Sequence, residues 1–351
     1  MIYYSGRKIK LELEGESHSE CISIKIYGLE KNSEINLSEL DFFMQRRHGD
    51  GGRLAELCST RRREPDKAVF DKGVRIRDAI AVITGDAIEA HIDNTDVVKK
   101  DYDEIRTKLR PGHADLGVYL KYGKEGLKSG GGEFSGRMTA GICVAGGMAR
   151  QILSKYGIEV IADIETIGGI KLADGNSSQN KPDDKLIEYI KKIKDKGDSL
   201  GGTVTCSVKG MPGGIGGSYF DGLESSFAYA MFGIPSVKGI EFGSGLRGTK
   251  LTGSQNNDEY FLENKKTITH KNDQGGISGG ISTGMDIDLR VYFKPIPSIR
   301  ISQKTVDVET MKETEISVKG RHDVCVVPRV LPVVEALASI VILDRIMDIN
   351  P

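Results

Sequence analysis

Two histidines lie in short polar segments where a side chain could give or take a proton near neutral pH. His18 follows Ser17 in the segment GESHSE, and His113 lies in the segment LRPGHADLGV. A Pro-Gly pair interrupts regular structure, so we expect His113 on a turn or just after one. A serine beside a histidine can relay a proton. Each histidine taken alone is more often a solvated or hydrogen-bonded loop residue, so the segments by themselves leave both explanations open.

An arginine-rich region could bind an anion. The segments QRRHGDGGR and STRRRE contain Arg46, Arg47, Arg53, Arg61, Arg62 and Arg63. The whole chain has a net charge of -1, so an anion site must be local, and we expect no nucleic-acid partner. A solvated loop face explains the same arginines equally well. Arg321 stands near Asp323 in KGRHDVC, where a surface salt bridge is the usual explanation.

A glycine-rich segment, GGGEFSGRMTAG at residues 130–141, runs into a stretch of apolar residues with helical spacing. Free backbone N–H groups in such a loop, together with the positive end of a helix, can face an anion. The segment lacks the GKS/T of a phosphate-binding Walker loop and the GxGxxG of a dinucleotide site. It therefore indicates an anion or cofactor site of another kind.

Spacing disfavours several other site classes. The six histidines show neither HxH nor HxxxH spacing, so we expect no metal. The five cysteines form no CxxC pair, which is typical of reduced thiols in a cytoplasmic protein. The N-terminal segment has no apolar core, and no run approaches 18 uncharged apolar residues. We therefore expect a cytoplasmic protein that has no membrane partner.

Hydrophobic periodicity predicts the elements that must position these residues. Alternation predicts strands at 8–15, 21–28, 203–210 and 285–295, and a strand pair within 74–93 that turns at residues 84–86. Helical spacing predicts a helix capped at Ser38, a buried helix after the GGG segment, and helices at 182–198, 221–233 and 331–347. This order favours an α+β fold with largely antiparallel sheets, organised as a single domain over residues 1–351.

Read together, GESH, RREPD, RPGHAD, GGG with SGRMT, GSQN, GGISGG and GRHD follow one another in an order that resembles the chorismate synthases, from about residue 9 to the C-terminal helix. The resemblance implies a β-α-β sandwich of antiparallel sheets around buried helices. It also implies a lyase that converts 5-enolpyruvylshikimate 3-phosphate to chorismate by a 1,4-anti elimination. Reduced FMN as cofactor, NADPH as a candidate reductant and a homotetramer are implied in the same way.

The resemblance assigns roles to particular residues. His113 would sit beside the flavin, His18 would protonate the departing phosphate, and Asp323 with Ser17 would relay a proton. The implied substrate-binding residues are Arg46, Arg47, Arg53, Arg137 and Arg321. The implied FMN-binding residues are Ser135, Pro235, Ser236, Gly279, Lys294, Pro295, Ile296, Pro297, Ser298 and Arg321.

Some positions depart from the family pattern. Glu133 and Phe134 stand where an arginine and a serine are usual, His48 replaces an arginine, and Asp273 replaces a histidine. These changes leave open an alternative, a non-catalytic paralogue that binds FMN or a phosphorylated metabolite. A nucleotide-dependent transferase is a further alternative.

Overall fold

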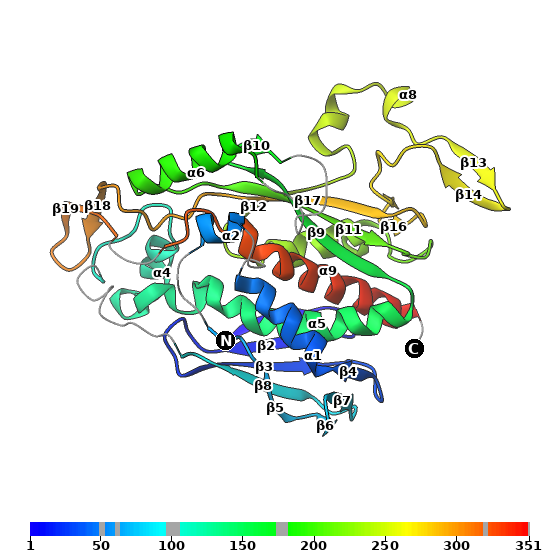
Figure 1. The fold of residues 1–351 in the computed structure, drawn as a ribbon, viewed down its shortest axis with the longest axis horizontal. Helices are drawn as coiled ribbons and strands as arrows, with labels where there is room; N and C mark the ends of the chain where they lie inside the picture. Colours follow the sequence, from blue (N-terminus) through cyan, green and yellow to red (C-terminus); the bar gives the residue numbers. More distant parts are fainter. Residues whose placement is uncertain (49–52, 60–63, 96–105, 173–181, 319–321, 350–351) are drawn as a thin grey trace.

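The computed structural model describes residues 1–48, 53–59, 64–95, 106–172, 182–318 and 322–349, and two five-stranded antiparallel sheets enclose a layer of helices (Figure 1). The first sheet has the order β1 (Ile2–Ser5), β2 (Lys10–Glu14), β3 (Cys21–Tyr27), β8 (Ile88–Asp93) and β5 (Val69–Lys72). The second has the order β10 (Ile170–Lys171), β9 (Glu159–Ile167), β11 (Gly202–Lys209), β17 (Ile287–Phe293) and β12 (Val237–Phe242). The predicted α+β class with antiparallel sheets is confirmed.

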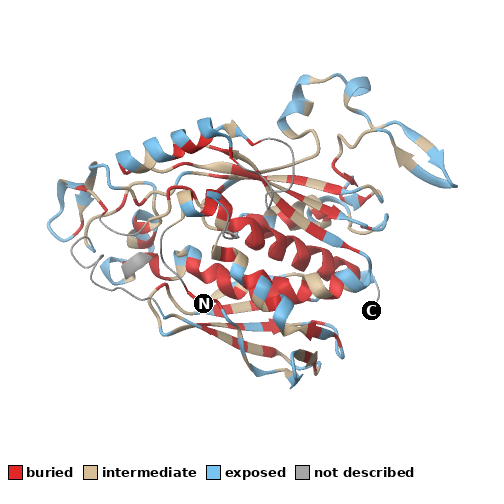
Figure 2. Ribbon diagram, viewed as in Figure 1, coloured by how far each residue is buried: buried red, intermediate tan, exposed pale blue. Residues whose placement is uncertain are grey.

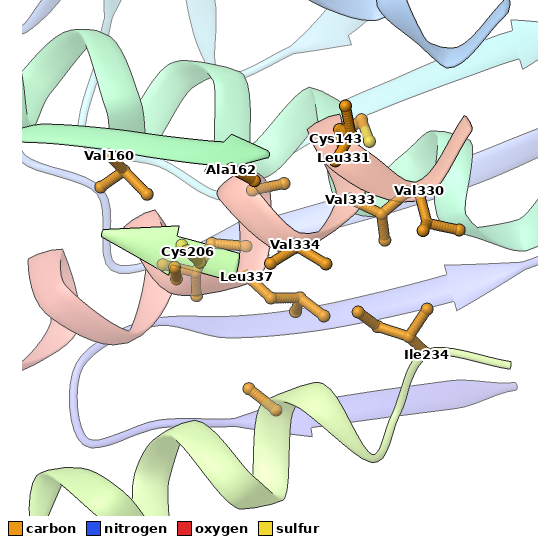
Figure 3. Packing of buried hydrophobic residues seen from close by; sticks show 14 of the residues in the cluster. Cys143, Val160, Ala162, Cys206, Ile234, Val330, Leu331, Val333, Val334 and Leu337 are labelled. Atoms are coloured by element: carbon orange, nitrogen blue, oxygen red, sulfur yellow. The ribbon is translucent and has the colours of Figure 1, made fainter. Parts of the chain in front are cut away.

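The layer between the sheets is built mainly from α5 (Thr139–Lys155) and α9 (Val327–Ile349), with α1 (Leu37–Gln45) and α7 (Leu223–Met231) beside them (Figure 1). Figure 2 shows α5 and α9 buried along most of their length, as their apolar sequences predict. A Cβ atom at Gly146 would lie 2.2 Å from the Cβ of Ala336, so the glycine lets α5 and α9 approach closely. Figure 3 shows α9 side chains packed beside Ala162 of β9 and Cys206 of β11.

One hydrophobic cluster runs from Ile9 to Ile346 and draws on both sheets and the helices between them. Burying a Leu-sized side chain stabilises a fold by about 1.5–3 kcal/mol, so this cluster is the main source of stability. The single-domain organisation stays a prediction. Among the described helices, none combines the length and apolar character that a bilayer crossing requires.

The shorter elements lie around this sandwich. They are β4 (Glu34–Asn36), β6 (Val74–Arg77), β7 (Ile80–Ile83), α2 (Arg53–Cys58), α4 (Asp115–Tyr122), α6 (Asp184–Lys196), α8 (Gly253–Asn256), the pair β13 (Tyr260–Glu263) and β14 (Lys266–Thr269), β15 (Ile277–Ser278), β16 (Ile281–Ser282), β18 (Gln303–Asp307) and β19 (Lys312–Ile316). The predicted helix at 182–198 is confirmed as α6: the side chain of Asp183 accepts a hydrogen bond from the N–H of Leu186, and Gly197, with φ 75°, ends the helix.

Two local predictions were wrong. The cap of α1 is Asn36 rather than Ser38, because the Asn36 side chain accepts hydrogen bonds from the N–H groups of Ser38 and Glu39. The segment 74–93 does reverse near residues 84–86, but its strands do not pair there. Instead β7 pairs with β6 across a turn that contains Asp78 at φ 52°, while β8 joins the large sheet next to β3.

Candidate active site

His113 lies on the turn before α4, where the sequence predicted it. Its backbone N–H donates to the carbonyl of Arg110 at 3.1 Å. Its ring nitrogen Nδ1 lies 2.6 Å from Oδ1 of Asp115. Arg110 donates to the same carboxylate from its backbone N–H, Nε and Nη2 at 3.0, 2.7 and 2.8 Å. The imidazole is therefore held in one orientation by a carboxylate that is itself held in place.

The carboxylate of Asp115 is ionised in this arrangement. Burial alone raises its pKa, but the hydrogen bonds from His113 and Arg110 and the charge of Arg110 outweigh burial and hold the pKa well below its usual range. An ionised carboxylate only accepts hydrogen bonds, so Asp115 serves as an acceptor for the groups around it.

The glycine-rich segment joins the two histidine segments. It forms the 3-10 turns η3 (Ser129–Phe134) and η4 (Gly136–Met138) and then continues as α5. Gly131 packs against His113, since a Cβ atom there would lie 3.2 Å from Cε1 and 3.3 Å from Nε2 of the ring. The next glycine, Gly132, accepts a hydrogen bond from the N–H of Ser17 at 3.3 Å. Ser17 and His113 thus touch neighbouring residues of one loop, and His18 follows buried Ser17 on the turn between β2 and β3.

Two of the predicted arginines meet at one buried carboxylate. Nε of Arg47 donates to Oδ2 of Asp66 at 2.9 Å, and Nη1 of Arg137 donates to Oδ1. Arg47 also donates from Nη1 to the hydroxyl of Thr139 at 2.7 Å, and Arg137 from Nε to the side-chain oxygen of Asn94 at 2.7 Å. No described residue accepts a hydrogen bond from Nη2 of Arg47. This nitrogen can therefore serve a ligand.

The remaining predicted arginines have different environments. Arg46 makes a two-pronged ion pair with Glu335 of α9, at 2.6 and 3.0 Å. Arg53 is exposed on α2 and has no ion-pair partner among the described residues. Arg321 lies outside the described residues.

Asp323 lies close to this arginine cluster. Both of its carboxylate oxygens accept hydrogen bonds from Nη1 of Arg329, at 3.2 and 3.0 Å. Nε of Arg329 donates to the carbonyl of Arg47 at 3.0 Å. The N–H of Val324, the next residue, donates to the carbonyl of Cys58 at 2.6 Å. The segment before α9 is therefore tied both to the Arg47 region and to α2.

The segment 294–298 packs against the turn that carries His113. Nζ of Lys294 donates to the carbonyl of Gly112, and Pro297 lies beside the same glycine. The N–H of Lys294 donates to the carbonyl of Ser236 at 2.9 Å, next to Pro235, and Ser298 is buried. Pro295 and Ile296 complete the segment, and the hydroxyl of Ser199 donates to the carbonyl of Ile296 at 2.7 Å. Ser135 caps η4, where its side chain accepts from the N–H of Arg137.

Gly279 does not join this group within one chain. The neighbouring Gly280 packs on the carbonyl of Gly217 and accepts a hydrogen bond from the N–H of Leu223 at 2.9 Å. Asp221, just before α7, binds Arg345 near the C-terminal end of α9. Arg329, which binds Asp323 near the start of α9, is 16 residues before Arg345, which corresponds to roughly 24 Å of helix. The segment around Gly280 therefore lies toward the other end of α9 from Asp323.

A pocket of about 710 Å³ opens beside His113. Glycines and apolar side chains form much of its wall, including Gly15, Gly126, Gly131, Gly132, Ala114, Val118, Leu127 and Phe134. Carboxylates also line it, namely Glu14, Glu16, Asp115, Glu125 and Glu133, with Lys128 as the basic side chain. The carboxylates make this pocket unfavourable for a polyanion, while its glycines and apolar side chains can contact an apolar group.

The residues that depart from the family pattern occupy distinct places. Glu133 and the half-exposed Phe134 line the pocket. His48 lies with Nε2 3.9 Å from Oδ2 of Asp66, and burial is the main cause that lowers its pKa. Asp273 makes ion pairs with Arg247 and Lys271, in the part of the chain that carries α8 and β13–β14.

The sequence reasoning missed three residues that organise the site: Asp66, Asp115 and Arg329. Asp115 and Asp66 are in the segments RPGHAD and RREPD, so their place in segments that carry the family resemblance was a usable signal. Arg329 lies in the apolar C-terminal helix, and nothing in its local sequence points to Arg47.

The family model of chorismate synthase matches residues 9–347. A chorismate synthase of Dehalococcoides mccartyi is 40% identical and covers 97% of this chain and 95% of its own length. The chorismate synthase of Pyrococcus abyssi is also 40% identical and covers 97% of both chains.

A crystal structure titled as that of a chorismate synthase has the same fold, with a TM-score of 0.73, at 24% identity over 98% of this chain and 93% of that chain. The function and the lyase class expected from the sequence are confirmed by the family match and the curated relatives, and these comparisons give no support to a non-catalytic paralogue. The chain therefore belongs to the chorismate synthase family.

Proposed function

We propose that this chain converts 5-enolpyruvylshikimate 3-phosphate to chorismate by a 1,4-anti elimination of phosphate, with reduced FMN as the cofactor. The observation that carries the proposal is the shared loop: residues 131–137 contact His113, contact Ser17 and position Arg137. When bound, the reduced flavin would supply the transient electron density that eases cleavage of the C–O bond.

The residues around the pocket fit a flavin ring. The backbone of Gly131 lies against the His113 ring at a position where a Cβ atom would crowd it, so the wall can approach a flat group closely. The acidic side chains on the same wall do not suit a phosphate. We therefore assign the FMN phosphate to the segment Lys294 to Ser298, together with Ser135 and Arg321, with Ser236 and Pro235 behind that segment.

His113 would hold or donate a proton at Nε2 toward the cofactor, because its Nδ1 is already bound to Asp115. His18 would give its proton to the departing phosphate and so reduce the charge that must leave. Ser17 and Asp323 would carry the proton released from the substrate ring away from the reacting centre. In this scheme the substrate loses one ring proton and one phosphate, and no net oxidation occurs.

The substrate carries a phosphate and two carboxylates, which guanidinium groups bind well. Arg53 and Nη2 of Arg47 are the donors that we assign to it. Arg46 and Arg137, which are bound to Glu335 and Asp66, would contribute mainly by holding neighbouring groups in place, and Arg321 would add a further charge.

The decisive experiment supplies the substrate with chemically reduced FMN under anaerobic conditions and measures chorismate formation by absorbance. We expect turnover that requires reduced flavin and is absent with oxidised FMN kept under oxidising conditions. Tight flavin binding without turnover would instead identify a binding paralogue. Adding NADPH and oxidised FMN tests whether the chain reduces its own flavin.

The proposed homotetramer can be tested by light scattering during size-exclusion chromatography. In that assembly we assign Gly279 to the site of a neighbouring subunit. A cytoplasmic location is part of the same proposal and is tested by cell fractionation.

A further inference from the structure

We propose that Asp115 is a positioning residue that fixes the tautomer of His113, an inference that rests on the proposed function of His113. The distance of 2.6 Å between Nδ1 and Oδ1 is short for a nitrogen–oxygen hydrogen bond, and both side chains are mostly buried. The contact is part of the chain itself and needs no ligand to form.

Arg110 fixes the orientation of the Asp115 carboxylate toward the histidine. Its backbone N–H and its Nε both donate to Oδ2, while its Nη2 donates to Oδ1, the oxygen that also faces His113. Four donors thus surround one buried carboxylate. Neither carboxylate oxygen can rotate away without leaving a buried guanidinium group short of its partner.

This arrangement has a consequence for the other ring nitrogen. Because Nδ1 carries the hydrogen that Asp115 accepts, Nε2 has a lone pair in the neutral ring and can take up a proton. In the protonated ring both nitrogens are donors, and Asp115 balances the positive charge. His113 can therefore bind and release its proton at Nε2 alone, on the side of Gly131.

The substitution Asp115→Asn should reverse this choice. The carboxamide oxygen would stay where the two donors of Arg110 point, at the present place of Oδ2. The NH2 group would then face His113 and Nη2 of Arg110, which loses its acceptor, whereas the opposite orientation would leave two Arg110 donors unpaired. Nδ1 of His113 would become the acceptor, and Nε2 would carry the hydrogen in the neutral ring. The shape of the site changes little, but the proton is on the wrong nitrogen.

The first test is independent of activity. In ligand-free protein labelled with 15N-histidine, the resonances of His113 are assigned by comparison with His113→Gln. We expect the neutral wild-type ring to carry its hydrogen on Nδ1 and the ring in Asp115→Asn to carry it on Nε2. A wild-type ring protonated on Nε2 alone would overturn the inference, whatever the variant does.

The second test measures turnover with reduced FMN. We expect Asp115→Asn to lower kcat by a factor on the order of 100 or more, as wrong-tautomer variants do in other enzymes, with KM and flavin affinity changed by less than about threefold. Asp115→Glu, which keeps the charge, should recover part of kcat. A value of kcat within about twofold of wild type in a folded Asp115→Asn protein would also overturn the inference.

The chain offers a matched control in Asp71, which makes the same kind of contact with Nδ1 of the partly exposed His91 at 2.9 Å, outside the site. Asp71→Asn should leave kcat unchanged. If the wild-type protein itself makes no chorismate, the proposed function fails, and the NMR comparison still decides the tautomer question separately.

Discussion

Arg47 and Asp66 form a buried ion pair, with Nε of the arginine 2.9 Å from Oδ2 of the carboxylate and both side chains less than a tenth exposed. Arg137 binds the other carboxylate oxygen. One carboxylate therefore compensates two buried guanidinium groups, and removing it leaves positive charge with little solvent to stabilise it.

Asp66→Asn should lower the free energy of unfolding by about 3–5 kcal/mol, because breaking a buried pair leaves an uncompensated charge. Urea denaturation followed by circular dichroism measures the change. Glu263→Gln, on an exposed strand, is the control and should alter stability by less than about 0.5 kcal/mol. A loss below about 1 kcal/mol in Asp66→Asn would show that Asp66 is not the main counter-charge.

The stabilising effect of Asp66 should depend on pH in a defined direction. Burial raises its pKa, but Arg47 and Arg137 outweigh burial, so the folded-state pKa lies below its usual range. A group with a depressed folded pKa stabilises the fold fully above its unfolded pKa, about 3.9, and loses this effect as pH falls through the folded pKa. The difference in unfolding free energy between wild type and Asp66→Asn should be constant from about pH 6 to 5 and shrink below about pH 4. A difference that grows on acidification would contradict this assignment.

Gly131→Ala should impair catalysis by moving His113. Gly131 has φ 98°, and a Cβ atom there would lie 3.2 Å from the imidazole ring. We expect a loss of stability of about 1–3 kcal/mol from the backbone strain, together with a fall in kcat of at least about tenfold. Gly136→Ala in the same loop is a close control, since no atom lies within 4 Å of a Cβ there and its φ is not positive. Equal kinetics for the two variants would count against a role for the Gly131 contact.

Arg53→Ala should weaken substrate binding without disturbing the fold. Arg53 is exposed and has no ion-pair partner among the described residues, so its removal breaks no internal contact there. Loss of one charge-assisted hydrogen bond of about 1.5–3 kcal/mol corresponds to a rise in KM of roughly 10- to 150-fold. Steady-state kinetics and flavin titration provide the comparison, with exposed Arg75→Ala as the control. A parallel loss of flavin affinity would move Arg53 to the cofactor site.

The sequence predicted those features that depend on neighbouring residues. The apolar periodicity of α5 and α9 and the alternation in β2 and β3 identified the sandwich because burial imposes those periods. The pairing of β6, β7 and β8 was wrong because a turn signal near residue 85 marks a reversal without saying which strand lies alongside.

The same limit applied to the site. Ser17, His18 and His113 could be singled out by residue type, but the pairing of Arg47 with Asp66 joins residues 19 apart, and that of Arg46 with Glu335 joins residues 289 apart. Local sequence carries no direct record of such contacts. It also could not show that Arg46 and Arg137 form ion pairs with Glu335 and Asp66 in the folded chain.

The chain passes from η4, which ends at Met138, directly into α5, which begins at Thr139 and runs through the centre of the sandwich against α9. The loop that forms part of the pocket wall is thus directly continuous with one of the two central buried helices. We expect a ligand that binds tightly beside His113 to raise the melting temperature of the entire molecule. We also expect a larger side chain at Gly146, in the interior, to slow turnover.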